Sequence, residues 1–313
     1  MDLIEGVLQA DPLSIARAIS MVEDGDSDLG ELSAGLFPHT GRAWTVGLTG
    51  APGVGKSTLA GELIRTVRDL ERTVAVLAID PTSPFTGGAL LGDRLRMQMH
   101  ATDPGVFIRS MATRGHLGGM ALAAPEAVRI LDAAGYDLVV VETVGVGQAE
   151  VDVAAATDTT LVVVSPGWGD AIQVAKAGIL EVADVFVVNK ADREGASAAV
   201  RDLQQMISMG SAPDDWTPPV VTTAAAIGQG IDELWEAVSS HRARLEASGR
   251  VAPNRRGRLV REVEALAAER LRARVASLLD GDDGLADDLL ERRTDPYAAA
   301  AILMQRVATV GDP

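Results

Sequence analysis

Short runs of aliphatic and β-branched residues recur along the chain and alternate with segments of helical spacing. Strands that alternate with helices predict a mostly parallel sheet with helices on both faces. Residues Leu138 to Val141 are apolar at every position, which is typical of a strand that is buried on both sides. The predicted strands are Trp44 to Leu48, Val74 to Ile79, Val106 to Ser110, Asp137 to Glu142, Thr160 to Val164, Val185 to Val188 and Val220 to Thr222.

Both ends of the chain have a helical pattern of their own. Pro12 to Ile19 is amphipathic, and an acidic loop from Glu23 to Asp28 follows it. Pro253 to Arg258 has the composition of a linker. Beyond it, apolar residues return at helical spacing, which predicts a C-terminal helical arm that could pack on a second subunit. They are Val260, Val263, Ala267, Leu271, Val275 and Leu278.

Composition limits the kinds of partner and compartment. A formal net charge of −16 argues against general binding to nucleic acid, because most of the surface repels a phosphate backbone. The chain has no cysteine, so disulfides and thiolate metal sites are excluded. It has neither a basic leader nor an apolar run near the ~20 residues of a membrane span. We therefore expect a cytoplasmic protein that does not bind membranes.

One segment carries a phosphate-binding motif. It follows a predicted strand, precedes the helical stretch Leu59 to Leu70, and fits the P-loop pattern G-x-x-x-x-G-K-[ST]. Glycine lets backbone amides point into one concavity, and Lys56 adds a cation for the β- and γ-phosphates. The hydroxyl of Ser57 is expected to ligate Mg²⁺. An accidental glycine-rich turn would explain the pattern less well. The predicted residues are Gly50, Ala51, Pro52, Gly53, Val54, Gly55, Lys56, Ser57 and Thr58.

A second motif points to guanine as the base. Asn189, Lys190 and Asp192 directly follow the predicted strand Val185 to Val188. A carboxylate at Asp192 can accept hydrogen bonds from N1–H and the N2 amine of guanine, and adenine lacks this donor pair. We therefore predict GTP and not ATP as substrate, although Asn-Lys can also mark a simple turn. After the next strand, the backbone amides of Thr223, Ala224 and Ala225 are candidates for binding the guanine O6.

Acidic residues at strand ends are candidates for magnesium binding and catalysis. Glu142 ends one predicted strand, and a carboxylate beside the P-loop can reach Mg²⁺ or its water. Gly145, three residues later, can offer a flexible N–H to the γ-phosphate. Asp80 ends another strand and is either a second magnesium residue or a cap before Pro81. The predicted catalytic residues are Lys56, Glu142 and Asp80.

Two glycine-rich loops, residues 82–97 and 113–119, are either plain connections or switch segments that reorder with the γ-phosphate. The chain resembles one family in these two loops, in the P-loop, from Glu142 to Glu150 and from Asn189 to Asp192. It is the family of G-protein chaperones of adenosylcobalamin-dependent acyl-CoA mutases, called MeaB in bacteria and MMAA in humans and once described as ArgK transport ATPases. The resemblance extends from Trp44 to about Trp235.

The resemblance implies a SIMIBI-class P-loop GTPase, which converts GTP to GDP and phosphate with Asp80, Asp93 and Glu142 around Mg²⁺. It implies an N-terminal helical extension at residues 1–40, a GTPase domain at 41–248 and a helical dimerisation arm at 249–313. The implied partner is a mutase whose cofactor loading and protection are gated by GTP. The mutase could act on methylmalonyl-CoA, isobutyryl-CoA or a hydroxyacyl-CoA.

Residues 167–178 fall where the family has its third switch, and here the usual pair of lysines is reduced to Lys176, while Trp168 is an added bulky side chain. Two other functions remain open at this point. A transport-associated ATPase or kinase would not need the Asn189 to Asp192 motif. A metal-insertion GTPase for a nickel or cobalt enzyme would need metal ligands near the switches, where only His116 is found. Gln148 is a possible residue for positioning the attacking water.

Overall fold

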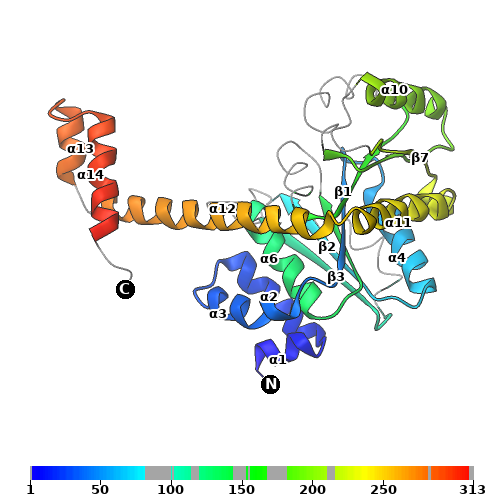
Figure 1. Cartoon of the computed structure of the whole chain (residues 1–313), viewed down its shortest axis with the longest axis horizontal. Coiled ribbons are helices and arrows are strands. Elements are labelled where there is room, and N and C mark those ends of the chain that lie inside the picture. Colours follow the sequence, from blue (N-terminus) through cyan, green and yellow to red (C-terminus); the bar gives the residue numbers. More distant parts are fainter. Residues whose placement is uncertain are drawn as a thin grey trace. The chain divides into compact units, whose positions relative to one another are not determined.

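The centre of the molecule is a parallel sheet (Figure 1). The computed structural model describes residues 2–81, 100, 102–113, 120–143, 153, 156–167, 182–209, 216–280 and 283–309. In this part of the chain the strand order is β3-β2-β4-β1-β5-β6-β7, and every pair is parallel. All seven predicted strands are confirmed: β1 (Trp44–Thr49), β2 (Val74–Pro81), β3 (Val106–Thr113), β4 (Leu138–Thr143), β5 (Thr159–Val164), β6 (Val185–Val188) and β7 (Val220–Thr222).

Strand register decides which segments meet. In β1, Leu48 lies opposite Glu142 of β4, and Thr49 lies opposite Val162 of β5. Because all strands are parallel, the segments that follow them leave from the same edge of the sheet, where ligands bind in open α/β folds. The P-loop after β1 is therefore placed beside Glu142 and beside the segments that follow β6 and β7.

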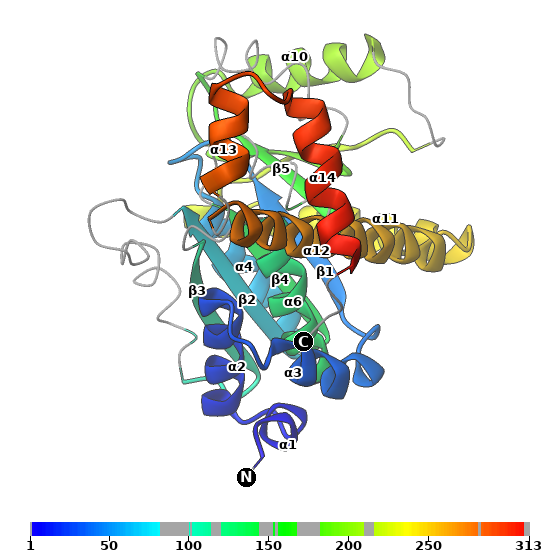
Figure 2. The same cartoon turned by 90° about the vertical axis from the view of Figure 1, so that its left-hand side faces the viewer.

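Helices cover both faces of the sheet (Figure 2). Alternate strand residues belong to hydrophobic cores on opposite faces. Leu138 and Val140 contact the core formed with α4 (Lys56–Asp69) and α11 (Ile231–Ala247). Val139 and Val141 belong to the core formed with α6 (Met120–Ala133) and the N-terminal helices. On β5 and β6, the face opposite α4 and α11 is covered by α10 (Ala196–Met209). This double cover explains why the strands are apolar at successive positions.

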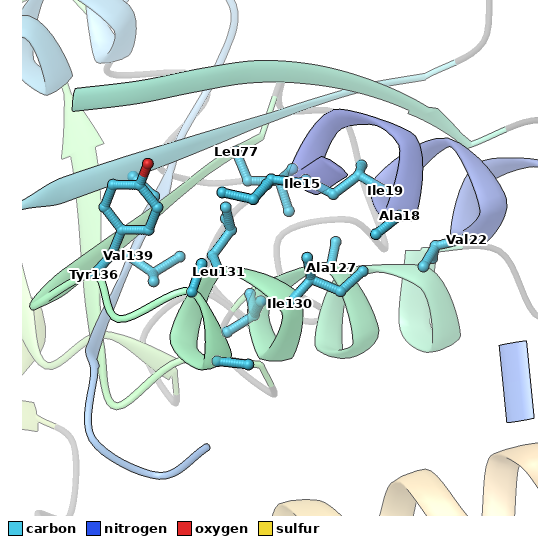
Figure 3. Packing of buried hydrophobic residues seen from close by; sticks show 14 of the residues in the cluster. Ile15, Ala18, Ile19, Val22, Leu77, Ala127, Ile130, Leu131, Tyr136 and Val139 are labelled. Carbon is cyan, nitrogen blue, oxygen red and sulfur yellow. The ribbon is translucent and has the colours of Figure 1, made fainter. Parts of the chain in front are cut away.

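The N-terminal helices are α1 (Leu3–Leu8), α2 (Pro12–Asp24) and α3 (Leu29–Leu36), with a short 3-10 helix, η1 (Phe37–His39). The amphipathic pattern of α2 is confirmed. Its N-terminus is capped by Asp11, whose carboxylate accepts the backbone N–H of Ser14 at 2.8 Å. Its apolar side, including Ile15 and Ile19, packs on α6 and the sheet (Figure 3). The N-terminal helices thus enlarge the main core.

The predicted linker from Pro253 to Arg258 is wrong, because α12 (Val251–Asp280) runs through it. Proline is tolerated in the first turn of a helix, where the missing N–H has no partner within the helix. The arginines in this segment bind the sheet edge, as described below. The predicted C-terminal helical arm is present as the rest of α12, α13 (Asp283–Leu290) and α14 (Pro296–Thr309).

The chain divides into two compact units, residues 1–258 and 259–313. The sheet and all the helices that cover it belong to the first unit. In the second unit, Leu285, Ala299 and Leu303 form a small core. Across both units, the described helices include none with the length and apolar character needed to cross a bilayer.

Candidate nucleotide-binding site

The P-loop between β1 and α4 depends on glycine at specific places. Gly50, Gly53 and Gly55 have φ angles of 137°, 78° and 101°, in the left-handed region that other residues seldom adopt. A Cβ on Gly50 would lie 2.1 Å from the carbonyl oxygen of Val163, and one on Gly55 would lie 2.4 Å from Nδ2 of Asn189. The loop therefore fits closely against β5 and against the segment after β6.

Lys56 is the first residue of α4 and is buried. Its Nζ donates to the carbonyl oxygens of Gly50 at 2.6 Å and Ala51 at 3.0 Å. The ammonium group is thus held inside the turn of the P-loop, next to the N-terminus of α4. The N-terminal amides of a helix and a nearby ammonium group both attract anions, so this arrangement can bind a polyphosphate chain.

Ser57 and Glu142 meet although 85 positions separate them in the sequence. The Ser57 hydroxyl donates to Oε1 of Glu142 at 2.7 Å, and both side chains are buried. A hydroxyl and a carboxylate are oxygen donors of the kind that Mg²⁺ binds beside phosphates. The donor set therefore fits magnesium, and it lies directly after the lysine of the P-loop.

Of the other predicted magnesium residues, Asp80 lies in the described part of the chain. The backbone of Asp80 belongs to β2, where it pairs with Ala112 of β3, and the preceding Ile79 pairs with Thr143 of β4. Asp80 thus leaves the sheet at the same edge as Glu142. Other residues in the predictions lie outside the described part of the chain: Asp93, Gly145, Gln148, Trp168, Lys176, His116 and the loops 82–97 and 114–119.

Asn189 connects the two ends of the site. Its Nδ2 donates to the carbonyl oxygen of Val54 at 2.9 Å, and its Oδ1 accepts from the Thr223 hydroxyl at 3.0 Å and the Ala225 amide at 3.1 Å. The neighbouring Lys190 donates from Nζ to the carbonyl oxygen of Gly53 at 2.5 Å. Motif reasoning assigned both residues to the nucleotide and missed that they fasten the P-loop to the segments that follow β6 and β7. No local pattern reveals these partners.

The segment after β7 is shaped by its own hydrogen bonds. The amide of Thr223 donates to Val188 O, and that of Ala224 donates to Gln229 O, both at 2.9 Å. Since the Ala225 amide donates to Asn189, all three predicted O6-binding amides also have acceptors within the protein. They precede or begin a 3-10 helix, η4 (Ala225–Ile227). Asp192 follows the end of β6, and its side chain is exposed to solvent.

Comparison with known proteins identifies the family. A family model described as methylmalonyl Co-A mutase-associated GTPase MeaB matches residues 15–279. The chain belongs to the MeaB family. This confirms the resemblance found in the sequence, and the chain is accordingly a GTPase that hydrolyses GTP to GDP and phosphate.

Individual relatives agree with this assignment. A protein from Pyrococcus horikoshii is 46% identical over 309 residues, which cover 98% of each chain. The mouse protein named methylmalonic aciduria type A homolog, mitochondrial, is 33% identical over 271 residues, covering 81% of this chain and 65% of the mouse protein. A crystal structure described as LAO/AO transport system kinase has 27% identity and a TM-score of 0.74, covering 98% of this chain and 97% of that one. The fold is that of a P-loop GTPase.

Proposed function

We propose that this MeaB-family GTPase requires Mg²⁺ and acts as a chaperone of an adenosylcobalamin-dependent acyl-CoA mutase, gating cofactor loading and protecting the mutase. The observation that carries the proposal is the match of residues 15–279 to a family described as mutase-associated. Its mouse relative is named after methylmalonic aciduria, which also supports a methylmalonyl-CoA mutase or a related enzyme as the partner.

In this proposal the nucleotide is held by groups on one sheet edge. The backbone N–H groups of residues 50–58, except Pro52, which has none, and the ammonium of Lys56 bind the phosphates, and Asp192 selects guanine. Ser57 and Glu142 hold Mg²⁺, and Asp80 and Asp93 complete its surroundings. When bound, Mg²⁺ neutralises the charge that develops on the β- and γ-phosphates. Gly145 and the segment after β7, with Thr223, Ala224 and Ala225, position the γ-phosphate and the base.

The Ser57–Glu142 hydrogen bond supports the metal assignment through its position. It places one hydroxyl and one carboxylate directly beside Lys56, the first residue of α4. Lys56 supplies positive charge, and the preceding loop supplies amide donors, so the protein can orient the phosphates before hydrolysis. Positioning and charge stabilisation account for most of the catalysis in phosphoryl transfer. A partner that completes such a site can therefore change the rate.

Linkage makes the chaperone role testable. If the mutase favours one nucleotide state, then GTP must change the affinity for the mutase by the same factor as the mutase changes the affinity for GTP. The experiment is steady-state GTPase activity with and without purified methylmalonyl-CoA, isobutyryl-CoA and hydroxyacyl-CoA mutases, and Lys56→Ala as the control for contaminating activity. We expect one mutase to raise the rate at least about tenfold and to bind in a nucleotide-dependent way. If none stimulates hydrolysis or forms such a complex, the chaperone role is wrong, although the GTPase assignment stands.

We further propose that the C-terminal unit forms a homodimer. Within residues 259–280, α12 buries no side chain, whereas Val260, Val263 and Leu266 are exposed. Only Leu285, Ala299 and Leu303 are buried among the described residues of this unit. A unit with so small a core and so much exposed apolar surface needs cover to be stable. A second copy of the same helix offers an apolar surface of the same kind, as in other two-fold interfaces.

A further inference from the structure

Two carbonyl groups of the P-loop are held by side chains of the segment that follows β6. Nδ2 of Asn189 donates to the carbonyl oxygen of Val54 at 2.9 Å, and Nζ of Lys190 donates to that of Gly53 at 2.5 Å. The two segments also pack tightly, since a Cβ on Gly55 would lie 2.4 Å from Nδ2 of Asn189. The shape of the P-loop therefore depends on two residues of the guanine motif.

The peptide group between Val54 and Gly55 shows the effect of these contacts on the backbone. Its carbonyl oxygen binds Asn189, and in a trans peptide the N–H points in the opposite direction. Within the described part of the chain, this N–H of Gly55 donates to no acceptor, and neither does that of Gly53. Backbone N–H groups in turn conformations form concave sites that bind anions. The contact with Asn189 therefore fixes the direction of an amide that is available to a phosphate oxygen.

Protein contacts also fix the two residues that hold the P-loop. Asn189 is 2% exposed, and its Oδ1 accepts from the Thr223 hydroxyl at 3.0 Å and from the Ala225 amide at 3.1 Å. Lys190 has a φ of 58°, a left-handed conformation that is unfavourable for a residue with a Cβ, and its carbonyl oxygen accepts from the Arg193 amide at 3.0 Å. All of these partners belong to the protein, so the contacts that hold the P-loop do not require a guanine base.

We propose that Asn189 and Lys190 are positioning residues for the phosphate subsite, and that the P-loop they hold binds inorganic pyrophosphate without a base or a sugar. Pyrophosphate has the same P–O–P linkage as the β- and γ-phosphates of GTP, and Lys56 offers it the same ammonium group. Asn189 and Lys190 thus contribute to phosphate binding as well as to base binding. The inference rests on the GTPase assignment and is independent of any mutase.

The test is titration calorimetry of the full chain with inorganic pyrophosphate at a fixed Mg²⁺ concentration. We expect the native protein to bind pyrophosphate in competition with GDP. Asn189→Ala and Lys190→Met should each weaken pyrophosphate binding at least about fivefold, because each removes a hydrogen bond that orients the loop. Lys190→Met also removes a charge, so Arg193→Met is its matched control. Arg193 is exposed on the same turn, and its loss should change the affinity for pyrophosphate less than about twofold.

Asp192→Asn separates phosphate positioning from base recognition. Asp192 belongs to the same motif, but its exposed carboxylate has no hydrogen bond with the P-loop among the described contacts. We therefore expect Asp192→Asn to weaken GDP binding and to leave the affinity for pyrophosphate within about twofold of the native value.

A motif that acts on the base alone, or that only stabilises the fold, would give a different result. Asn189→Ala would then lose affinity for GDP or melt at a lower temperature, while binding pyrophosphate as the native protein does. That result overturns the proposal, as does a native protein that fails to bind pyrophosphate or binds it together with GDP. If Asn189→Ala does not fold, Lys190→Met and Arg193→Met decide the question, because Lys190 lies outside the hydrophobic core.

Discussion

At the scale of single residues, Asp192 is the side chain on which guanine selectivity should depend. It lies exposed after β6, where its carboxylate can pair with two donors of guanine. An amide offers one donor and one acceptor, so Asp192→Asn should weaken GDP binding at least about tenfold and improve binding of xanthosine diphosphate. Titration calorimetry with both nucleotides measures this, and Asp202→Asn, an exposed change on α10, is the control. Equal affinity of the native protein for ATP and GTP would contradict the assignment.

We expect a change at Glu142 to affect GTP hydrolysis more than nucleotide binding. Glu142→Gln keeps an oxygen that can accept the Ser57 hydroxyl but removes the negative charge. If the carboxylate holds Mg²⁺, we expect kcat to fall at least about tenfold, with GDP affinity changed by less than about threefold. Steady-state hydrolysis over a range of Mg²⁺ concentrations is the measurement. A native rate at saturating Mg²⁺ would remove Glu142 from the proposed metal site.

A buried histidine and a partly buried carboxyl group, with 31% of its side chain exposed, form a pair outside the nucleotide site. Nε2 of His241 lies 3.3 Å from Oδ1 of Asp184, and Nδ1 of His241 lies 3.0 Å from the Thr159 hydroxyl. Burial raises the pKa of Asp184 from 3.8 to about 7. Burial and the nearby positive charge of Arg244 lower the pKa of His241 from 6.5 to about 4. The two groups therefore affect stability in opposite directions.

The raised pKa of Asp184 contributes stability at low pH that is lost as the pH rises from about 3.8 to about 7. The lowered pKa of His241 contributes stability at neutral pH that is lost as the pH falls from 6.5 to about 4. The two contributions oppose each other between these values. Asp184→Asn removes the first, so its free energy of unfolding relative to native should rise by roughly 1 to 3 kcal/mol between pH 4.5 and 6.5. Urea denaturation of both proteins at both pH values tests this. If the difference in unfolding free energy between variant and native protein is the same at pH 4.5 and 6.5, the raised pKa of Asp184 is contradicted.

At the scale of elements, two glycines around the P-loop should respond in opposite ways to alanine. Gly50→Ala places a methyl group 2.1 Å from Val163 O at a φ of 137°, so the turn or β5 must shift. Gly61 lies inside α4 with open space around its Cα. We expect Gly50→Ala to lower the melting temperature and nucleotide affinity, and Gly61→Ala to stabilise α4 by up to ~1 kcal/mol. Thermal unfolding with and without GDP compares them, and equal effects would contradict the described loop.

At the scale of the whole molecule, the proposed dimer depends on the apolar side of α12. Val263 is 64% exposed, so a charged residue there should be harmless in a monomer and disruptive in a two-fold interface. We expect Val263→Glu to give monomers in sedimentation velocity while the basal GTPase rate stays within about twofold. Arg261→Glu changes charge on the same helix without removing apolar surface and is the control. A native protein that sediments as a monomer at micromolar concentration would refute the dimer.

The strands and the P-loop could be predicted because their signals are local. Strands β1, β4, β5 and β6 are short runs that are buried at every position, and Gly50 to Thr58 carries its phosphate-binding chemistry within one contiguous segment. The motif from Asn189 to Asp192 is also local, because its residues are contiguous and directly follow one strand, β6. Identity of the base and of the family could therefore be inferred before any contact was known.

Tertiary structure alone decided the contacts between distant residues. Ser57 and Glu142 are 85 positions apart, Asn189 and Val54 are 135 apart, and Arg258 and Asp158 are 100 apart, so no periodic pattern records these pairs. The same reason explains the error at residues 253–258. Proline, asparagine and arginine there have the composition of a linker, but helix formation is compatible with Pro253 in the first turn, and Asp158 on the sheet edge binds the arginines. The partners that make this segment a helix lie elsewhere in the sequence and meet it only in the folded chain.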